Sequence, residues 1–212
     1  MPDTPQATRS RTTAPPQSPA TAVPRSGRRR PTVALTFDDG PHPESTLELL
    51  ATLVAAGHRA TFFVCGQQAE RHPELLLALD AAGMWIGNHS YSHAHLTGLD
   101  RAAVAQELGR TQRIVRELTG TAPTLFRPPY GETDLEVRAA AAAEGLTEVL
   151  WTTDTRDWAG APAAEIAAVA GQAPAGAVVL LHDGRSATVG ALPAILRAWS
   201  ARGLVPGAVT RT

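Results

Sequence analysis

Two neighbouring carboxylates, Asp38 and Asp39, follow a short apolar run and stand directly before Gly40-Pro41. Within a regular strand, successive side chains point to opposite faces, so the two could not share a site while the strand continued. A turn at Gly40-Pro41 would end the strand and let both carboxylates face one cleft. The same residues are ordinary in a solvated turn, so this signal depends on polar residues elsewhere in the chain.

Two histidines, His89 and His93, supply the side chain that most often binds transition metals. Their spacing of four residues predicts that both imidazoles lie on one face of a helical turn. With one carboxylate they would form a two-histidine, one-carboxylate site, a catalytic zinc arrangement that leaves one position open for water. His95 does not share that face, and we expect it to lie outside the site. The pair alone is a weak signal.

Three later apolar segments are each followed by residues that can move protons, bind anions or stack. These are Arg127 and Tyr130, then Asp154, Asp157 and Trp158, then His182 and Asp183. Each group alone could be a buried polar cluster with a local partner. Their joint occurrence at successive strand ends is the strong signal, because active sites of parallel α/β folds lie at the carboxyl ends of the strands.

Strands and helices alternate after the first thirty residues. The helices are indicated by apolar residues at intervals of three and four, by capping residues and by terminal glycines. In the first helix, Leu47, Leu50 and Val54 form the expected buried stripe, and Asp100 is the expected cap of a later helix that ends before Gly120. We expect strands at 33–37, 60–64, 84–87, 124–126, 147–151, 177–181 and 204–205, and helices at 43–56, 73–82, 101–119, 133–144, 162–169 and 192–201.

The alternation of continuously apolar strands with helices predicts an α/β fold with a buried parallel sheet. A (β/α) barrel is favoured over an open sheet because polar clusters follow almost every strand, and only a barrel brings all of those ends to one rim. The first turn reads Asp-Asp-Gly and not Gly-x-Gly-x-x-Gly, so a dinucleotide-binding fold has no support.

Composition indicates one domain and excludes some partners. The 212 residues are 43% hydrophobic, enough for a real core. All 19 basic residues are arginine; six lie in the first thirty positions, and the rest of the chain has thirteen against nineteen acidic residues, a net charge of −6. This acidic body argues against nucleic acid as a partner. Cys65 is the only cysteine, so no disulfide can form within the chain.

Residues 1–30 are rich in Pro, Thr, Ser, Ala and Arg without apolar periodicity. We predict a disordered tail there, followed by a catalytic domain at 31–212. The tail lacks the apolar core of a signal peptide, and no stretch approaches the ~18–20 apolar residues of a transmembrane helix. The location stays open: cytoplasmic for the sequence as written, or exported if the start codon is misassigned.

Five short motifs occur in order between Thr36 and Asp183. They read Thr-Phe-Asp-Asp-Gly, His-Ser-x-x-His, Arg-Pro-Pro-Tyr, Asp-x-x-Asp-Trp and Leu-x-His-Asp. Together they resemble the five motifs of the polysaccharide deacetylases, the NodB-homology family or carbohydrate esterase family 4, over roughly residues 31–208. The resemblance implies a distorted (β/α) barrel, one divalent metal ion, and hydrolysis of N-acetyl groups on glycans such as peptidoglycan or chitin.

The resemblance also implies roles for the first three motifs. Asp39, His89 and His93 would bind the metal, zinc by default, with cobalt, manganese and nickel as alternatives. Asp38 would be the general base that takes a proton from water. Arg127 would pair with Asp38 and favour its charged form.

The remaining motif residues would complete the site. The backbone N–H of Tyr130 would help to hold the oxyanion. His182 would be the general acid for the leaving amine, and a buried carboxylate would raise its pKa: Asp154 by its position, with Asp157 as the alternative. The apolar pocket for the acetyl methyl group would be formed by two further residues, Trp158 and Leu180.

The leading hypothesis is therefore a monomeric, metal-dependent N-deacetylase of an amino-sugar glycan. The alternative keeps the fold and site but acts on a small-molecule amide, as deformylases and cyclic-amide hydrolases do. A glycan-binding module with a decayed site is the non-enzyme hypothesis. Against it stands the joint presence of the base, the acid and all three metal ligands.

Overall fold

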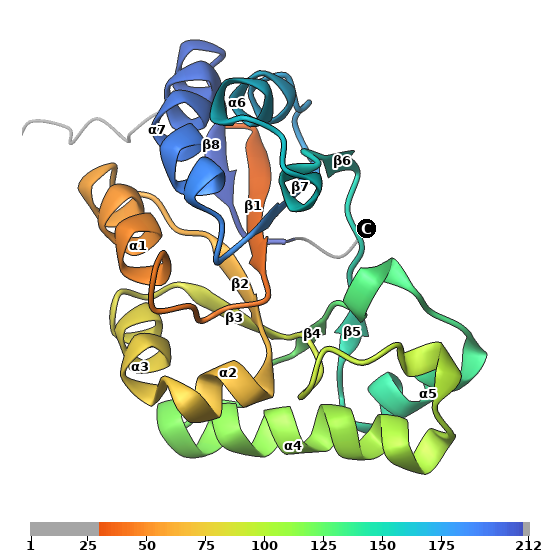
Figure 1. Cartoon of the computed structure of the whole chain (residues 1–212). Coiled ribbons are helices and arrows are strands. Elements are labelled where there is room, and N and C mark those ends of the chain that lie inside the picture. Colours follow the sequence, from red (N-terminus) through yellow and green to blue (C-terminus); the bar gives the residue numbers. More distant parts are fainter. Residues whose placement is uncertain (1–29, 210–212) are drawn as a thin grey trace, which may run out of the picture.

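The computed structural model describes residues 30–209, and its strands form one curled parallel sheet (Figure 1). The strand order is β5-β4-β3-β2-β1-β7-β6, and β8 pairs with the first half of β1. Because β5 and β6 do not pair with each other, the sheet closes only half of a barrel. The expected α/β fold with a distorted barrel is confirmed. The strands are β1 (Thr32–Asp38), β2 (Thr61–Val64), β3 (Trp85–Asn88), β4 (Leu125–Phe126), β5 (Thr147–Glu148), β6 (Thr153–Asp154), β7 (Val178–His182) and β8 (Val205–Gly207).

Helices lie around the outer side of the curled sheet (Figure 1). They are α1 (Thr46–Ala55), α2 (Gly66–Arg71), α3 (Pro73–Ala81), α4 (Arg101–Thr119), α5 (Leu135–Ala143), α6 (Ala163–Gly171) and α7 (Ser186–Ala201). The last two pack on each other, whereas α4 packs against α2, α3 and α5. Among the helices of residues 30–209, none has both the length and the apolar content needed to cross a membrane.

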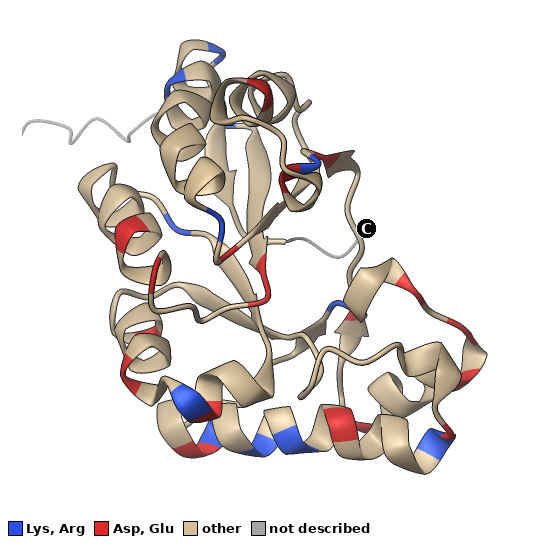
Figure 2. Cartoon of the chain, in the orientation of Figure 1, with Lys and Arg blue, Asp and Glu red and all other residues tan. Residues whose placement is uncertain are grey.

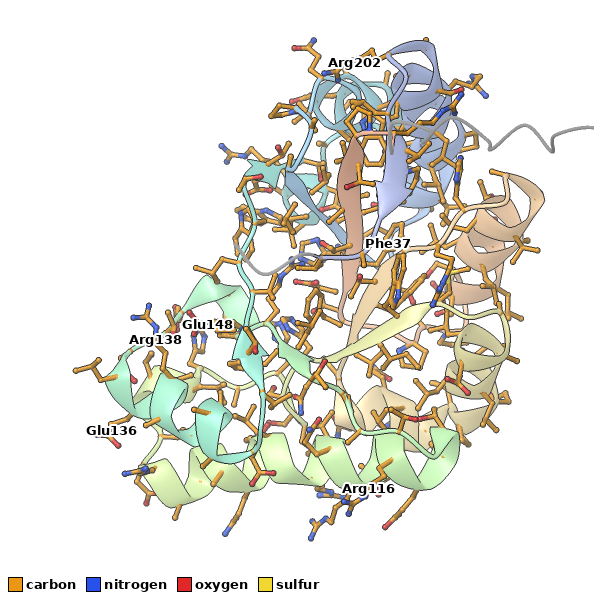
Figure 3. All side chains as sticks on the ribbon, turned by 180° about the vertical axis from the view of Figure 1, so that it is seen from behind. Phe37, Arg116, Glu136, Arg138, Glu148 and Arg202 are labelled. Atoms are coloured by element: carbon orange, nitrogen blue, oxygen red, sulfur yellow. The ribbon has the colours of Figure 1, made fainter. Side chains whose placement is uncertain are left out.

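The alternation of side chains along β1 decides which residues reach the inside of the half-barrel. Leu35 and Phe37 are fully buried in the core between sheet and helices; Phe37 is labelled in Figure 3. Burial of each such side chain contributes about 1.5–3 kcal/mol. The alternate residues, Thr36 and Asp38, face the other way, and the Arg127 guanidinium donates to both of them at 2.8 and 2.7 Å. One strand therefore supplies the core with one face and the site with the other.

The ends of α4 are where the sequence predicts them. The Asp100 side chain accepts a hydrogen bond from the Ala103 N–H at 2.8 Å, a cap of a kind worth about 1 kcal/mol. Gly120 ends the helix with a φ of 77°, which glycine adopts without steric cost. Val104 and Leu108 are buried, while both basic and acidic residues lie along the helix (Figure 2).

The expected buried stripe of α1 is wrong. Leu47 and Val54 are 52% and 55% exposed, whereas Leu49 and Leu53 are fully buried. Leu50 is buried as expected. The helix carries two sets of apolar residues at helical spacing, on two neighbouring faces. Packing against the sheet buries the set that differs from the one predicted from spacing.

Other elements also differ from the prediction. Helix α7 begins at Ser186, six residues before the predicted start, and strand β6 was not predicted. Helix α2 was not predicted, since its sequence, Gly-Gln-Gln-Ala-Glu-Arg, has no apolar periodicity. The strand expected at 147–151 ends at Glu148, and the chain leaves the sheet there. Helix α5 is capped by Asp134, which accepts a hydrogen bond from the Val137 N–H at 2.8 Å. Thr133, where the predicted helix begins, lies before this cap and donates its hydroxyl to Glu148.

The predicted tail at residues 1–30 falls almost wholly outside the described residues. The chain joins the sheet at Pro31, whose carbonyl accepts the Val205 N–H at 3.2 Å. The division into a tail and a domain at 31–212 therefore stays a prediction.

Candidate active site

The carboxyl ends of the strands meet around a pocket of about 440 Å³. Asp38 and His182, the last residues of β1 and β7, are register partners on neighbouring strands. The lining includes the predicted site residues except Arg127, which lies fully buried behind Asp38, and the alternative partner of His182, Asp157. It also includes Trp151 and Arg185. The residues predicted from the sequence to form the site therefore lie together at one rim of the sheet.

Asp39 turns its side chain into this pocket by a left-handed backbone conformation. Its φ is 74°, which a residue with a β-carbon rarely adopts. The strand itself runs on through Asp38. The turn that lets both carboxylates share the site is thus made at Asp39 and not, as expected, at Gly40-Pro41. In a continuing strand the two side chains would point to opposite faces, and the left-handed conformation of Asp39 brings them to the same side.

His89 and His93 lie near each other, with ring centroids 5.0 Å apart, but not on a helical turn. The segment after β3 is a loop in which Ser90 and His93 have φ values of 62° and 60°. The predicted helical geometry is therefore wrong, although the predicted proximity holds. The Nδ1 atom of His89 lies 2.7 Å from the Arg127 carbonyl oxygen, so Nδ1–H donates there and Nε2 is left as the ligand atom.

The Asp39, His89 and His93 set fits a divalent metal. Each offers one ligand atom, and these atoms lie within 4.8 Å of one another. Oδ1 of Asp39 is 3.4 Å from Nε2 of His89 and 3.2 Å from Nε2 of His93. Ligand atoms placed 2.0–2.2 Å from one metal ion are about 3.0–3.5 Å apart. The same Oδ1 is buried without a well-formed hydrogen bond, so it is free to take an ion.

Electrostatics also suit a cation at this cluster. Burial by itself disfavours the charged form of Asp39, but the imidazoles of His89 and His93 outweigh burial and hold the pKa of this carboxyl well below its ordinary value. Asp39 is therefore ionised, as a metal ligand must be. Two nitrogens and one carboxylate oxygen suit zinc and related transition ions, and leave open positions for water or substrate.

Asp38 is held by the buried side chain of Arg127. The guanidinium donates to Asp38 Oδ1 at 2.7 Å, and also to the carbonyls of Val149 and Leu150 at 3.2 and 3.3 Å. Burial lowers the pKa of Arg127, while Asp38 opposes the shift, and a guanidinium stays protonated at working pH in any case. The hydrogen bond between this fixed cation and the carboxylate holds Asp38 in place.

His182 pairs with Asp157 and not with Asp154. Its Nδ1 lies 2.8 Å from Asp157 Oδ1, and its backbone N–H donates to Oδ2 at 2.7 Å. Asp154 is turned away: it accepts from the Trp158 indole at 3.2 Å and from the Arg156 N–H at 2.8 Å. The expectation of Asp154 is therefore wrong, and the alternative, Asp157, holds. Arg156 has a φ of 58°, which redirects the chain between the two acids.

Aromatic side chains line two sides of the pocket. Trp158 and Tyr130 are 47% and 54% exposed, and Leu180 lies buried on the inner face of β7. Tyr130 has a φ of 62°. The His95 ring stacks on Tyr130 with centroids 4.0 Å apart, so His95 stays outside the metal cluster but contacts a wall of the site, which its sequence position did not indicate.

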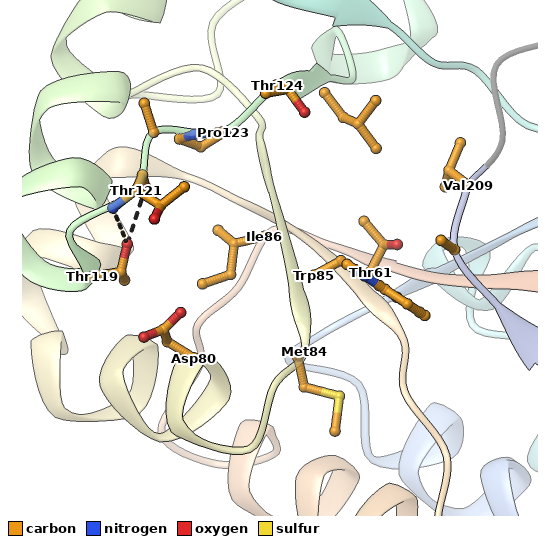
Figure 4. A pocket seen from close by; sticks show the side chains of 13 residues that line it. Thr61, Asp80, Met84, Trp85, Ile86, Thr119, Thr121, Pro123, Thr124 and Val209 are labelled. Carbon is orange, nitrogen blue, oxygen red and sulfur yellow. Dashed lines mark hydrogen bonds between the residues drawn. The ribbon is translucent and has the colours of Figure 1, made fainter.

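A second hollow, of about 470 Å³, lies at the opposite end of the sheet (Figure 4). Thr61, Trp85 and Leu125, which line it, are the first residues of β2, β3 and β4. None of the residues predicted to act in catalysis or metal binding lines this hollow. The candidate active site is therefore the pocket at the carboxyl ends.

Comparisons with known proteins agree with this assignment. A family model described as polysaccharide deacetylase matches residues 25–149. A chitooligosaccharide deacetylase of Sinorhizobium fredii is 36% identical over 199 residues, covering 86% of this chain and 92% of that protein. A peptidoglycan-N-acetylmuramic acid deacetylase of Bacillus subtilis, PdaC, is 38% identical over 152 residues, covering 71% of this chain and 32% of that protein.

The similarity extends to the three-dimensional structure. A family 4 carbohydrate esterase from Streptomyces lividans, in complex with acetate, is 43% identical with a TM-score of 0.82, covering 85% of this chain and 93% of that chain. The chain spans 27 to 55% of the length of three longer curated relatives that it matches. A match over more than half of the chain, at this identity and with this fold, leads to one conclusion: the chain belongs to the polysaccharide deacetylase family, carbohydrate esterase family 4.

Proposed function

We propose that the protein is a metal-dependent hydrolase that removes N-acetyl groups from an amino-sugar glycan and releases acetate. The observation that carries this proposal is the position of Asp38 and His182, register partners at two strand ends, beside the Asp39, His89 and His93 cluster. Side chains that could act as a base, an acid and a set of metal ligands thus lie around one pocket, a combination suited to amide hydrolysis.

The chain's residues divide the first step between them. A zinc ion held by Asp39, His89 and His93 would polarise the acetyl carbonyl and acidify a water molecule. Asp38, which accepts a hydrogen bond from Arg127, takes a proton from the attacking water as the water oxygen bonds to the carbonyl carbon. The Tyr130 backbone N–H donates to the oxygen that becomes negative.

The second step needs a proton on the departing nitrogen, because an amide nitrogen leaves poorly until it is protonated. His182 supplies this proton from Nε2, since its Nδ1 is held by Asp157. The C–N bond then breaks, giving a free amine on the sugar and acetate. Trp158 and Leu180 form the apolar wall against which the acetyl methyl group packs.

The choice of a glycan rests on the relatives, whose names refer to chitooligosaccharide and peptidoglycan. The exposed aromatic side chains of Tyr130 and Trp158 suit a sugar, whose apolar ring faces pack on aromatic rings. A chitooligosaccharide and a fragment of peptidoglycan are therefore the substrates to try first.

The test measures acetate release by the full chain from N-acetylated chitooligosaccharide, a peptidoglycan fragment and a small amide. Each reaction is run as purified, after treatment with a chelator, and after zinc is restored. We expect release from at least one glycan, loss with the chelator and recovery with zinc. His93→Ala should lose metal and activity together, whereas His58→Ala, away from the pocket, should keep both. Full activity in demetallated protein, or release from the small amide alone, would refute the proposal.

A further inference from the structure

Asp183 follows His182 in the chain, is only 3% exposed, and has no part in the chemistry described above. Its carboxylate is surrounded by donors: the hydroxyls of Ser45 and Thr46, each at 2.5 Å, and the Gly184 N–H at 2.9 Å. Ser45 and Thr46 stand at the start of α1. A buried carboxylate with three donors ties the end of β7 firmly to the start of that helix.

The same residue also contacts the chain on both sides of Asp39. The Asp183 N–H donates to the Asp38 carbonyl at 2.9 Å. On the other side, Gly40 lies so close to the carboxylate that a β-carbon there would overlap Oδ2. The Gly40 carbonyl is held in turn by the Cys65 N–H at 2.9 Å. We call residues 39–45 the β1–α1 loop; Asp183 contacts it at both ends.

The β1–α1 loop needs such support because of the conformation of Asp39. A non-glycine residue at a φ of 74° is strained and keeps that conformation only where its surroundings fix it. The conformation matters, because it brings Oδ1 to within 3.4 Å of His89 Nε2 and 3.2 Å of His93 Nε2. A rotation of the backbone at Asp39 toward ordinary values would carry the carboxylate away from both histidines.

We propose that Asp183 is a positioning residue of the metal site: it holds the β1–α1 loop so that Asp39 presents its carboxylate to the metal. This inference rests on the proposed function, which supplies the metal. His182 and Asp183 thus serve the same site in different ways, one by facing the pocket and the other by holding the loop that carries a ligand.

The test is the zinc affinity of the purified full chain, measured by competition with a chromophoric chelator. Asp183→Asn keeps the shape of the side chain but replaces one acceptor oxygen with an N–H donor toward Thr46 or Ser45. Loss of an outer partner of a metal ligand typically weakens binding about 10–100-fold, and we expect a loss in this range. The matched control is Trp199→Phe, which removes a buried hydrogen bond to the Ala170 carbonyl far from the pocket. It should lower the melting temperature and leave zinc affinity unchanged.

Two milder variants keep the inference testable if Asp183→Asn does not fold. Ser45→Ala removes one donor to the carboxylate, and Gly40→Ala pushes on the carboxylate from the other side; each should weaken zinc binding more than Trp199→Phe does. Wild-type zinc affinity in folded Asp183→Asn, or in both milder variants, would overturn the inference while leaving the proposed function intact. Failure of the wild-type chain to bind a divalent metal would overturn both.

Discussion

Oδ1 of Asp157 lies 2.8 Å from Nδ1 of His182, and Oδ2 of the same carboxylate accepts the His182 backbone N–H at 2.7 Å. One buried acid therefore fixes both the ring and the backbone of the proposed general acid. Burial by itself lowers the pKa of His182, but the hydrogen bond and charge of Asp157 outweigh it and raise that pKa above its ordinary value. His182 thus holds its proton at higher pH than a free histidine.

Replacing Asp157 with Asn should move the pH dependence of catalysis. A general acid must begin protonated, so kcat/KM falls as the pH rises through the His182 pKa. Without the carboxylate charge this pKa falls, and the basic limb of the profile moves to lower pH. Asp154→Asn is the matched control, because Asp154 faces the Trp158 indole. A basic limb that stays in place in Asp157→Asn, or that moves in Asp154→Asn, contradicts the pairing.

Asp38 and Asp39 should separate into a base and a ligand. Asp38→Asn keeps an oxygen for Arg127 but cannot take a proton, so activity should fall about 10²–10⁴-fold while the metal stays. Asp39→Asn should lose the metal as well. Elemental analysis alongside kcat distinguishes the two, and a metal-free Asp38→Asn protein would place Asp38 among the ligands instead.

Arg127 should be important for stability as well as for activity. It is fully buried, and truncation to Met would leave the Asp38 charge without a partner, a change that typically costs about 3–5 kcal/mol. The exposed pair of Arg138 with Glu148 at 3.3 Å is the control (Figure 3). Arg138→Met should cost less than ~1 kcal/mol in urea unfolding. Equal costs at the two sites would show that burial of the Arg127 pair is unimportant.

Asp154 should act on substrate binding through Trp158. Its carboxylate holds the indole N–H, and the indole is 47% exposed at the pocket. Asp154→Ala releases the ring, so KM for a glycan should rise several-fold with little change in kcat. A fall in kcat at constant KM would assign Asp154 to the chemical step after all.

A chain that begins at Pro31 should melt at the same temperature as the full chain. The first 30 residues have no periodic apolar positions to bury. Scanning calorimetry of both forms measures the difference. If the shorter chain is less stable by more than ~1 kcal/mol, the removed residues contribute to the domain and the boundary is wrong.

Much of the site could be predicted because the chemistry-bearing residues follow apolar strands, and parallel strands end at one rim. The partner of His182 could not. Asp154 and Asp157 stand in one loop, and the choice depends on a left-handed residue, Arg156, and on the short helical turn at Asp157–Ala159. Spacing carries no information on such backbone angles.

The same limit explains the other differences. His89 and His93 were expected on a helix, yet positive φ values at Ser90 and His93 bring their rings together in a loop. The contact of Asp183 with Ser45 links residues 138 positions apart. A single sequence read by local periodicity does not reveal it. Most helices and strands could be predicted from the sequence. The loop conformations that complete the site could not, because they depend on tertiary contacts.

The open half-barrel has a consequence for how the protein behaves among its own copies. A sheet that does not close leaves free edges, and free edges invite pairing with other chains and hence aggregation. Here the terminal strands β5 and β6 have two residues each, and β8 has three with Pro206 at its centre. Such short edges offer few backbone N–H and C=O groups with which a strand of another chain could pair. Within residues 30–209, the open sheet therefore presents only short edges to a neighbouring strand.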